Sequence, residues 1–99
     1  MEIETTQNEN QLSVVLTGRL DTVTSKELLE KLTIEERKGK DVVFDFKSLD
    51  YLSSAGLRAL VFFKKEAQQT GNKVEILNAN EMVKDIFKTT GFDKILNVK

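Results

Sequence analysis

Residues 42–57 have the sequence VVFDFKSLDYLSSAGL, and this stretch decides the class of fold. Residues 41–46 form an apolar run with little polar alternation, which is typical of a central strand covered on both faces. Asp45 is expected at the polar, loop-facing end of that strand. The two serines that follow, Ser53 and Ser54, precede an apolar helical pattern, and serine is a favoured residue at a helix start. A buried strand followed by a helix indicates an α/β fold.

The residues before this stretch predict a β-hairpin. Residues 3–7 and 11–18 both have the character of strands, and the second is mostly apolar and rich in β-branched residues. The polar residues 8–10 separate them. We therefore expect the first strand at an edge of the sheet and the second strand in a more buried position.

Two further helices are marked by polar residues at their starts. Thr24 and Glu27 fit a capping box, which is followed by leucines at helical spacing. Asn78 and Glu81 form a second pair of N-cap and N3 residues, and an apolar stripe then continues as far as Gly91.

The remaining elements complete a single domain. One helix opens at Ser53 or Ser54 and ends at Gly71, residues 73–77 form a strand, and residues 92–98 form a short strand or a packed extension. The predicted order is β-β-α-β-α-β-α. Strands separated by single helices favour right-handed parallel crossovers, so a mixed sheet is expected, with an antiparallel edge hairpin and parallel strands beyond it.

The composition excludes several kinds of chemistry. The 99 residues include no Cys and no His, which removes disulfides, thiolate nucleophiles, Cys-ligated zinc and Ser-His-Asp catalysis. Lys plus Arg (15) nearly balances Asp plus Glu (16), and the interleaved charges disfavour binding to nucleic acid or to a membrane surface. No apolar run approaches the ~20 residues that cross a bilayer. We expect a cytoplasmic protein that is not an enzyme and uses no metal or cofactor.

The two serines are candidates for modification. They follow the carboxyl end of a predicted parallel strand, where ligands and partners usually meet an α/β protein. A helix start stabilises an anion, and a phosphate would add about −1.5 to −2 charge there. The alternative is that the serines are only helix caps, each worth about 1 kcal/mol. Gly56 costs a helix about 0.5–1 kcal/mol relative to Ala, which suggests that some group approaches the backbone closely.

Three segments resemble the STAS domain family, which is named for sulfate transporters and anti-sigma factor antagonists. Residues 45–57 are similar to the central strand and Asp-Ser-Ser/Thr-Gly-Leu turn of the family, and residues 18–21 to its Gly-x-Leu-Asp element. Residues 71–92 match its carboxyl-terminal half. The resemblance covers nearly the whole chain in order, so residues 1–99 are identified as a STAS domain of the anti-sigma factor antagonist type.

The resemblance implies a bacterial regulator that binds an anti-sigma factor with serine kinase activity and so releases a sigma factor. It places Ser54 on the phosphoacceptor and Ala55 on the second hydroxyl residue of the motif. Ser53 falls on the preceding Asp of the family, and this departure leaves Ser53 as a second choice of acceptor. Phosphorylation would abolish binding, and a serine phosphatase would restore it.

The residues expected to face the partner are Asp21, Ser53, Ala55, Gly56, Arg58 and Phe62. Asp21 matches the family's aspartate and is either part of the partner surface or a cap before a helix. Phe62 projects nearly opposite Leu57 on its helix, so it is either an interface anchor or covered by the tail that contains Ile95 and Leu96. The alternative function is a constitutive STAS accessory subunit that docks on a transporter ATPase or another signalling complex. The oligomeric state stays open.

Overall fold

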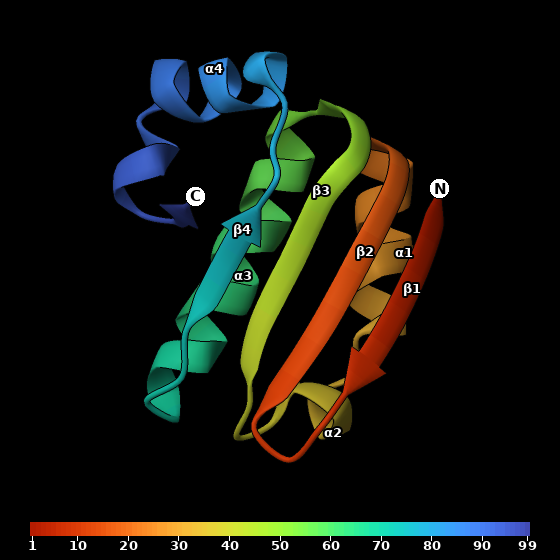
Figure 1. The fold of residues 1–99 in the computed structure, drawn as a ribbon, viewed down its shortest axis with the longest axis vertical. Helices are drawn as coiled ribbons and strands as arrows, with labels where there is room; N and C mark the ends of the chain where they lie inside the picture. Colours follow the sequence, from red (N-terminus) through yellow and green to blue (C-terminus); the bar gives the residue numbers. More distant parts are fainter.

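The computed structural model describes all 99 residues as a five-stranded sheet with helices packed on it (Figure 1). The strand order is β1-β2-β3-β4-β5, with β1 antiparallel to β2 and the other neighbours parallel. This confirms the predicted mixed α/β sheet with an edge hairpin. The elements are β1 (Glu2–Gln7), β2 (Gln11–Leu20), α1 (Thr22–Lys31), α2 (Ile34–Arg37), β3 (Asp41–Leu52), α3 (Ser54–Gln69), β4 (Val74–Leu77), α4 (Glu81–Thr90), the 3₁₀ helix η1 (Phe92–Lys94) and β5 (Asn97–Val98).

The observed order contains three elements more than the predicted β-β-α-β-α-β-α: α2, η1 and β5. The first helix of the sequence pattern is divided into α1 and the short helix α2, and the carboxyl-terminal tail forms η1 and then pairs as β5 with β4.

Helices α1 and α3 cover only one face of the sheet (Figure 1). Because the strand order from β2 to β4 never reverses, two right-handed crossovers place both helices on the same side. Val42, Phe44 and Phe46 are buried on that side, whereas Val43 and Asp45 between them are only half-buried. The expectation that this strand is covered on both faces is therefore wrong.

Four phenylalanines join the helices to the central strand. Phe44 and Phe46 of β3, Phe63 of α3 and Phe87 of α4 are each at most 1% exposed. The ring centroids of Phe44 and Phe63 are 5.7 Å apart, and those of Phe46 and Phe87 are 6.5 Å apart. These aromatic contacts fix α3 and α4 against β3.

Strand β3 runs well beyond its predicted end at Phe46, to Leu52. Its pairing with β2 continues through two register shifts, so the expected connection before the serines is itself strand. Asp45 therefore lies in the middle of β3 rather than at its end. Its carboxylate accepts hydrogen bonds from the Lys47 amide (2.9 Å) and the Asn78 side chain (3.1 Å).

Two predicted helix caps are displaced along the chain. Helix α1 is capped by Asp21, which forms a capping box with Thr24 as the N3 residue, so Thr24 is not the cap and Glu27 plays no part. Helix α4 is capped by Asn80 and not by Asn78. In both regions several consecutive polar residues can cap a helix, and the point at which the preceding strand ends selects one of them.

Gly56 is required by the packing of the chain itself. A Cβ atom at this position would lie 2.9 Å from the Leu20 carbonyl oxygen and 2.7 Å from Leu52 Cδ1. The close approach suggested by the sequence therefore comes from the ends of β2 and β3 and not from a partner.

Replacing Gly56 by Ala is expected to lower the free energy of unfolding by about 1–3 kcal/mol, because the added methyl group overpacks a buried contact with backbone. Urea unfolding followed by circular dichroism would measure the change. Ser54→Ala in the same helical turn is the control, and it should stay within about 0.5 kcal/mol of wild type. Equal stability of the two variants would contradict this role of Gly56.

Candidate functional site

The carboxyl ends of β2 and β3 place two helix starts side by side. Leu20 and Leu52 are paired at the ends of these parallel strands. The Ser53 amide donates to the Leu20 carbonyl oxygen (2.9 Å), which joins the two connections directly. Asp21 and Ser53, the next residues in each chain segment, cap α1 and α3. The structure thus brings Asp21 to the serine pair.

The two serines occupy different environments. Ser53 is half-buried, and its hydroxyl oxygen accepts a hydrogen bond from the Gly56 amide (3.2 Å). Ser54 is the first residue of α3 and is exposed. The amides of Ser54 and Ala55 lie in the first turn, where no earlier carbonyl of the helix can accept from them. The Ser54 hydroxyl is therefore exposed to solvent and, unlike the Ser53 hydroxyl, does not cap the helix.

Asp21 is a helix cap and a half-buried charge. Hydrogen bonds from the Thr24 amide and hydroxyl hold the pKa of the Asp21 carboxyl below its ordinary value of 3.8, with smaller contributions from the Val23 amide and the Arg19 charge. All three hydrogen bonds from Val23 and Thr24 go to Oδ1, at 3.0–3.1 Å. The second carboxylate oxygen therefore has no partner in the chain and is available to another molecule.

The lowered pKa predicts how Asp21 affects stability in acid. A depressed folded-state pKa stabilises the fold above the ordinary pKa, and this contribution is lost as the pH falls through the folded value. Asn caps helices as well as Asp but does not titrate, so Asp21→Asn should lose less stability than wild type between about pH 5 and about pH 2. Urea unfolding at several pH values would measure this.

The Asp41 carboxyl serves as an internal reference for that experiment. Hydrogen bonds from the Lys73 amide and the Asn72 side chain also lower its pKa. The substitution Asp21→Asn leaves these hydrogen bonds unchanged. The difference in pH dependence therefore isolates Asp21. Parallel stability curves for wild type and Asp21→Asn would contradict the assignment.

An exposed stripe of α3 begins at Ser54. Arg58 follows one turn later and is exposed, and the Phe62 side chain two turns later is 44% exposed. Phe62 packs edge-on against Phe63, with ring centroids 5.8 Å apart. The carboxyl-terminal tail does not bury Phe62, since 44% of this side chain stays exposed. Of the two interpretations of Phe62, the structure therefore supports an exposed aromatic residue beside the serines.

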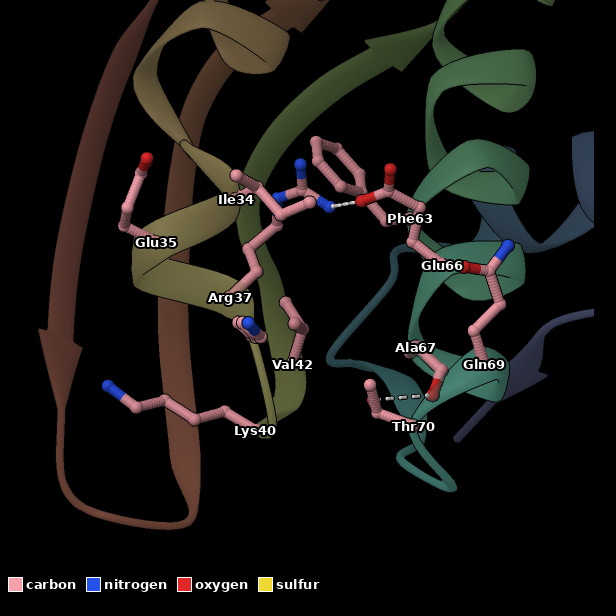
Figure 2. Close-up of a pocket in the computed structure, with 11 residues that line it drawn as sticks. Ile34, Glu35, Arg37, Lys40, Val42, Phe63, Glu66, Ala67, Gln69 and Thr70 are labelled. Atoms are coloured by element: carbon pink, nitrogen blue, oxygen red, sulfur yellow. Dashed lines mark hydrogen bonds and ion pairs between the residues drawn. The ribbon is translucent and has the colours of Figure 1, made fainter.

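A separate pocket of about 350 Å³ lies at the opposite end of the sheet, between α2, the start of β3 and the last turns of α3 (Figure 2). Arg37 crosses it and forms an ion pair with Glu66. The Arg37 Nε donates to the Leu32 carbonyl oxygen (2.8 Å), and its guanidinium carbon lies 4.9 Å from the Phe63 ring centroid. This contact was not predicted, because a single Arg among four consecutive charged residues carries no signal of burial in the sequence.

The structure shows neither a membrane-crossing helix nor a metal-binding cluster. None of the helices combines the length and the apolar composition that a membrane crossing requires. The acidic side chains do not gather anywhere into a group of three or more placed to hold a metal ion.

Comparison with known proteins identifies the fold. A model of the STAS domain family matches residues 2–99. The chain belongs to this family. The match spans both helix starts that form the candidate site, so the resemblance of the three sequence segments is confirmed for the chain as a whole.

The relatives of this STAS domain include anti-sigma factor antagonists of bacteria. The anti-sigma-B factor antagonist of Bacillus subtilis (strain 168) is 28% identical over 98 residues, which cover 99% of this chain and 90% of the relative. The anti-sigma factor antagonist SpoIIAA in its unphosphorylated form superposes with a TM-score of 0.73 at 14% identity, over 95% of this chain and 97% of the other. The Bacillus cell fate determinant SpoIIAA in the phosphorylated form gives 0.75 at 15% identity, over 99% and 91%. These two structures confirm the fold.

Proposed function

We propose that this STAS domain is an anti-sigma factor antagonist whose binding to an anti-sigma factor is switched off by phosphorylation of Ser54. The observation that carries the proposal is that the hydroxyl groups of the two serines have different environments. The Ser53 hydroxyl is engaged in capping α3, whereas the Ser54 hydroxyl is exposed at the first position of the helix. The name of the Bacillus subtilis relative supports the choice of partner.

The first turn of α3 suits a phosphate on Ser54. The unpaired amides of Ser54 and Ala55 and the positive end of the helix dipole favour an anion at this position. Arg58 follows four residues later, the spacing at which side chains on a helix meet, and arginine binds phosphate oxygens well. The phosphate is therefore accommodated without a change of fold, and the net charge moves from −1 to about −3.

The modified serine lies beside the residues proposed to face the partner. The free oxygen of Asp21 already carries negative charge next to this helix start, so a phosphate adds like charge to the same surface. A partner carboxylate that approaches this helix start is then repelled. In this account the anti-sigma factor supplies the serine kinase, and a phosphatase reverses the modification in the cytoplasm. The domain acts by binding and carries out no catalysis of its own.

Incubation with the cognate anti-sigma factor and ATP, followed by intact-mass measurement and phosphosite mapping, tests the site. We expect one phosphate on wild type and on Ser53→Ala, and none on Ser54→Ala. Uptake of phosphate by Ser54→Ala would contradict the assignment. Stable binding with no phosphate on any variant would instead support a constitutive accessory subunit.

A further inference from the structure

A groove lies between α1 and α3 and begins beside the serine turn. Its lining residues recur at positions i, i+3, i+4 and i+7 on each helix, and we name it the helix groove: Thr22, Ser25, Lys26, Leu29, Ala55, Arg58, Ala59 and Phe62. Its volume is about 270 Å³. Ser25, Ala55 and Ala59 are small, so the two helices leave a hollow between the larger side chains of Leu29 and Phe62, which are 38% and 44% exposed.

The Ser25 hydroxyl in this groove has no hydrogen-bond partner. Ser25 is 4% exposed and is the one buried polar side chain of the protein. Its Oγ is the one buried side-chain oxygen or nitrogen without a hydrogen bond. Leaving such a group unpaired costs about 1–3 kcal/mol, so Ala would serve the helix packing better. An oxygen atom of a bound ligand would satisfy this hydroxyl.

The charged residues of the helix groove are all positive. Lys26 and Arg58 line it, no acidic residue does, and neither cation belongs to an ion pair. A neighbouring hollow on the other side of Phe62 is lined by Arg58 and Lys65, again without an acidic residue. The pocket at the opposite end of the sheet differs, because both acidic and basic side chains line it (Figure 2).

We propose that the helix groove binds an apolar side chain of the partner that lies next to a carboxylate, as in an acidic amphipathic segment. Its volume is below the range of about 300–1,000 Å³ of most small-molecule sites, which suits one side chain of the size of leucine. Leu29 and Phe62 would contact the apolar group, Arg58 and Lys26 would attract the carboxylate, and the Ser25 hydroxyl would donate to one of the ligand's oxygens.

This inference rests on the proposed function and refines how the switch acts. Arg58 lies four residues after Ser54 in α3 and also lines the helix groove. A phosphate on Ser54 would pair with Arg58 and so withdraw a cation from the partner's carboxylate. The modification thus weakens docking along the groove as well as at the helix start.

Titration of the ¹⁵N-labelled protein with N-acetyl-L-leucine tests the groove without any partner protein. This probe joins a leucine side chain to a carboxylate. We expect a dissociation constant of about 1–10 mM, and amide shifts at Ser25, Leu29, Ala59 and Phe62. N-acetyl-L-leucinamide, which lacks the charge, should bind at least about 3-fold more weakly.

Two variants of the helix groove and one control variant show which side chains bind the probe. Ser25→Ala and Arg58→Gln should each weaken N-acetyl-L-leucine binding at least about 3-fold, whereas Lys38→Gln at the opposite end of the sheet should not change it. Ser25→Ala should keep or raise the unfolding midpoint, because it removes an unpaired buried hydroxyl, so weaker binding would not reflect unfolding.

The inference is overturned if shifts appear outside the helix groove only, if the uncharged probe binds equally well, or if Ser25→Ala binds like wild type. Because the titration uses neither anti-sigma factor nor kinase, it can fail while Ser54 is still phosphorylated. Conversely, groove binding can be observed in a protein that no kinase modifies.

Discussion

Replacing Ser54 by Asp is expected to weaken the complex with the anti-sigma factor by at least about 100-fold, which corresponds to about 2.7 kcal/mol. The added carboxylate lies at the first position of α3, beside the free oxygen of Asp21 and one turn from Arg58. It repels the partner's carboxylate and competes for the Arg58 cation that this carboxylate needs. Isothermal titration calorimetry with the purified anti-sigma factor would measure the change.

Two controls separate charge at Ser54 from charge in general. Ser54→Ala should bind within about 3-fold of wild type, because it adds no charge to the helix start and the exposed hydroxyl is not needed for folding. Thr33→Asp adds the same charge at the start of α2, at the opposite end of the sheet, and should also leave binding unchanged (Figure 1). If Thr33→Asp weakens the complex as much as Ser54→Asp, the effect is one of net charge and the account of the site fails.

Replacing Arg37 by Ala is expected to lower the free energy of unfolding by about 2–4 kcal/mol. The Arg37 side chain is only 10% exposed and connects α2 with α3 through Glu66 and the face of the Phe63 ring (Figure 2). It also donates to the Leu32 carbonyl oxygen at the end of α1. Its loss leaves the Leu32 oxygen and the Glu66 carboxylate without their partner. Because the Glu66 side chain is 29% exposed and can recover water, the loss is smaller than for a fully buried pair.

Urea unfolding of matched variants would measure this contribution. Lys38→Ala, the next residue along, is exposed and should change stability by no more than about 0.5 kcal/mol. Glu66→Gln should cost less than Arg37→Ala, because an amide still accepts from the guanidinium. If Arg37→Ala lowers the free energy of unfolding by less than about 0.5 kcal/mol, Arg37 does not hold α2 against α3.

Local patterns in the sequence were sufficient for the order and type of most elements. The hairpin was recognisable because the polar residues 8–10 interrupt two strand-like segments, and β1 and β2 pair across them. Gly91 was correctly placed after the last long helix, where its backbone adopts a left-handed conformation with φ 76°. These features depend on neighbours in sequence, which the chain displays directly.

The predictions failed where the outcome depends on contacts between distant segments. The cap of α1 is Asp21 rather than Thr24, because β2 continues pairing with β3 as far as Leu20. Val43 is half-buried although it is apolar, since α1 and α3 pack on the other side of the sheet. Gly56 is explained by the Leu20 carbonyl, which lies 36 positions earlier in the chain. None of these contacts has a local signature.

The residues of the candidate site also differ in whether a local sequence pattern reveals them. Ser54 and Asp21 were identified by their place in family-like motifs, and the structure brings both to one end of the sheet. Ser25 was missed, because its significance lies in an unpaired hydroxyl between two packed helices, which only the three-dimensional arrangement reveals.

The most direct measurement is the dissociation constant of the anti-sigma factor for this protein with and without phosphate on Ser54, determined on the same preparation before and after phosphatase treatment. We expect the phosphorylated form to bind at least about 100-fold more weakly and phosphatase treatment to restore full affinity. Equal dissociation constants for the two forms would contradict a switch at Ser54.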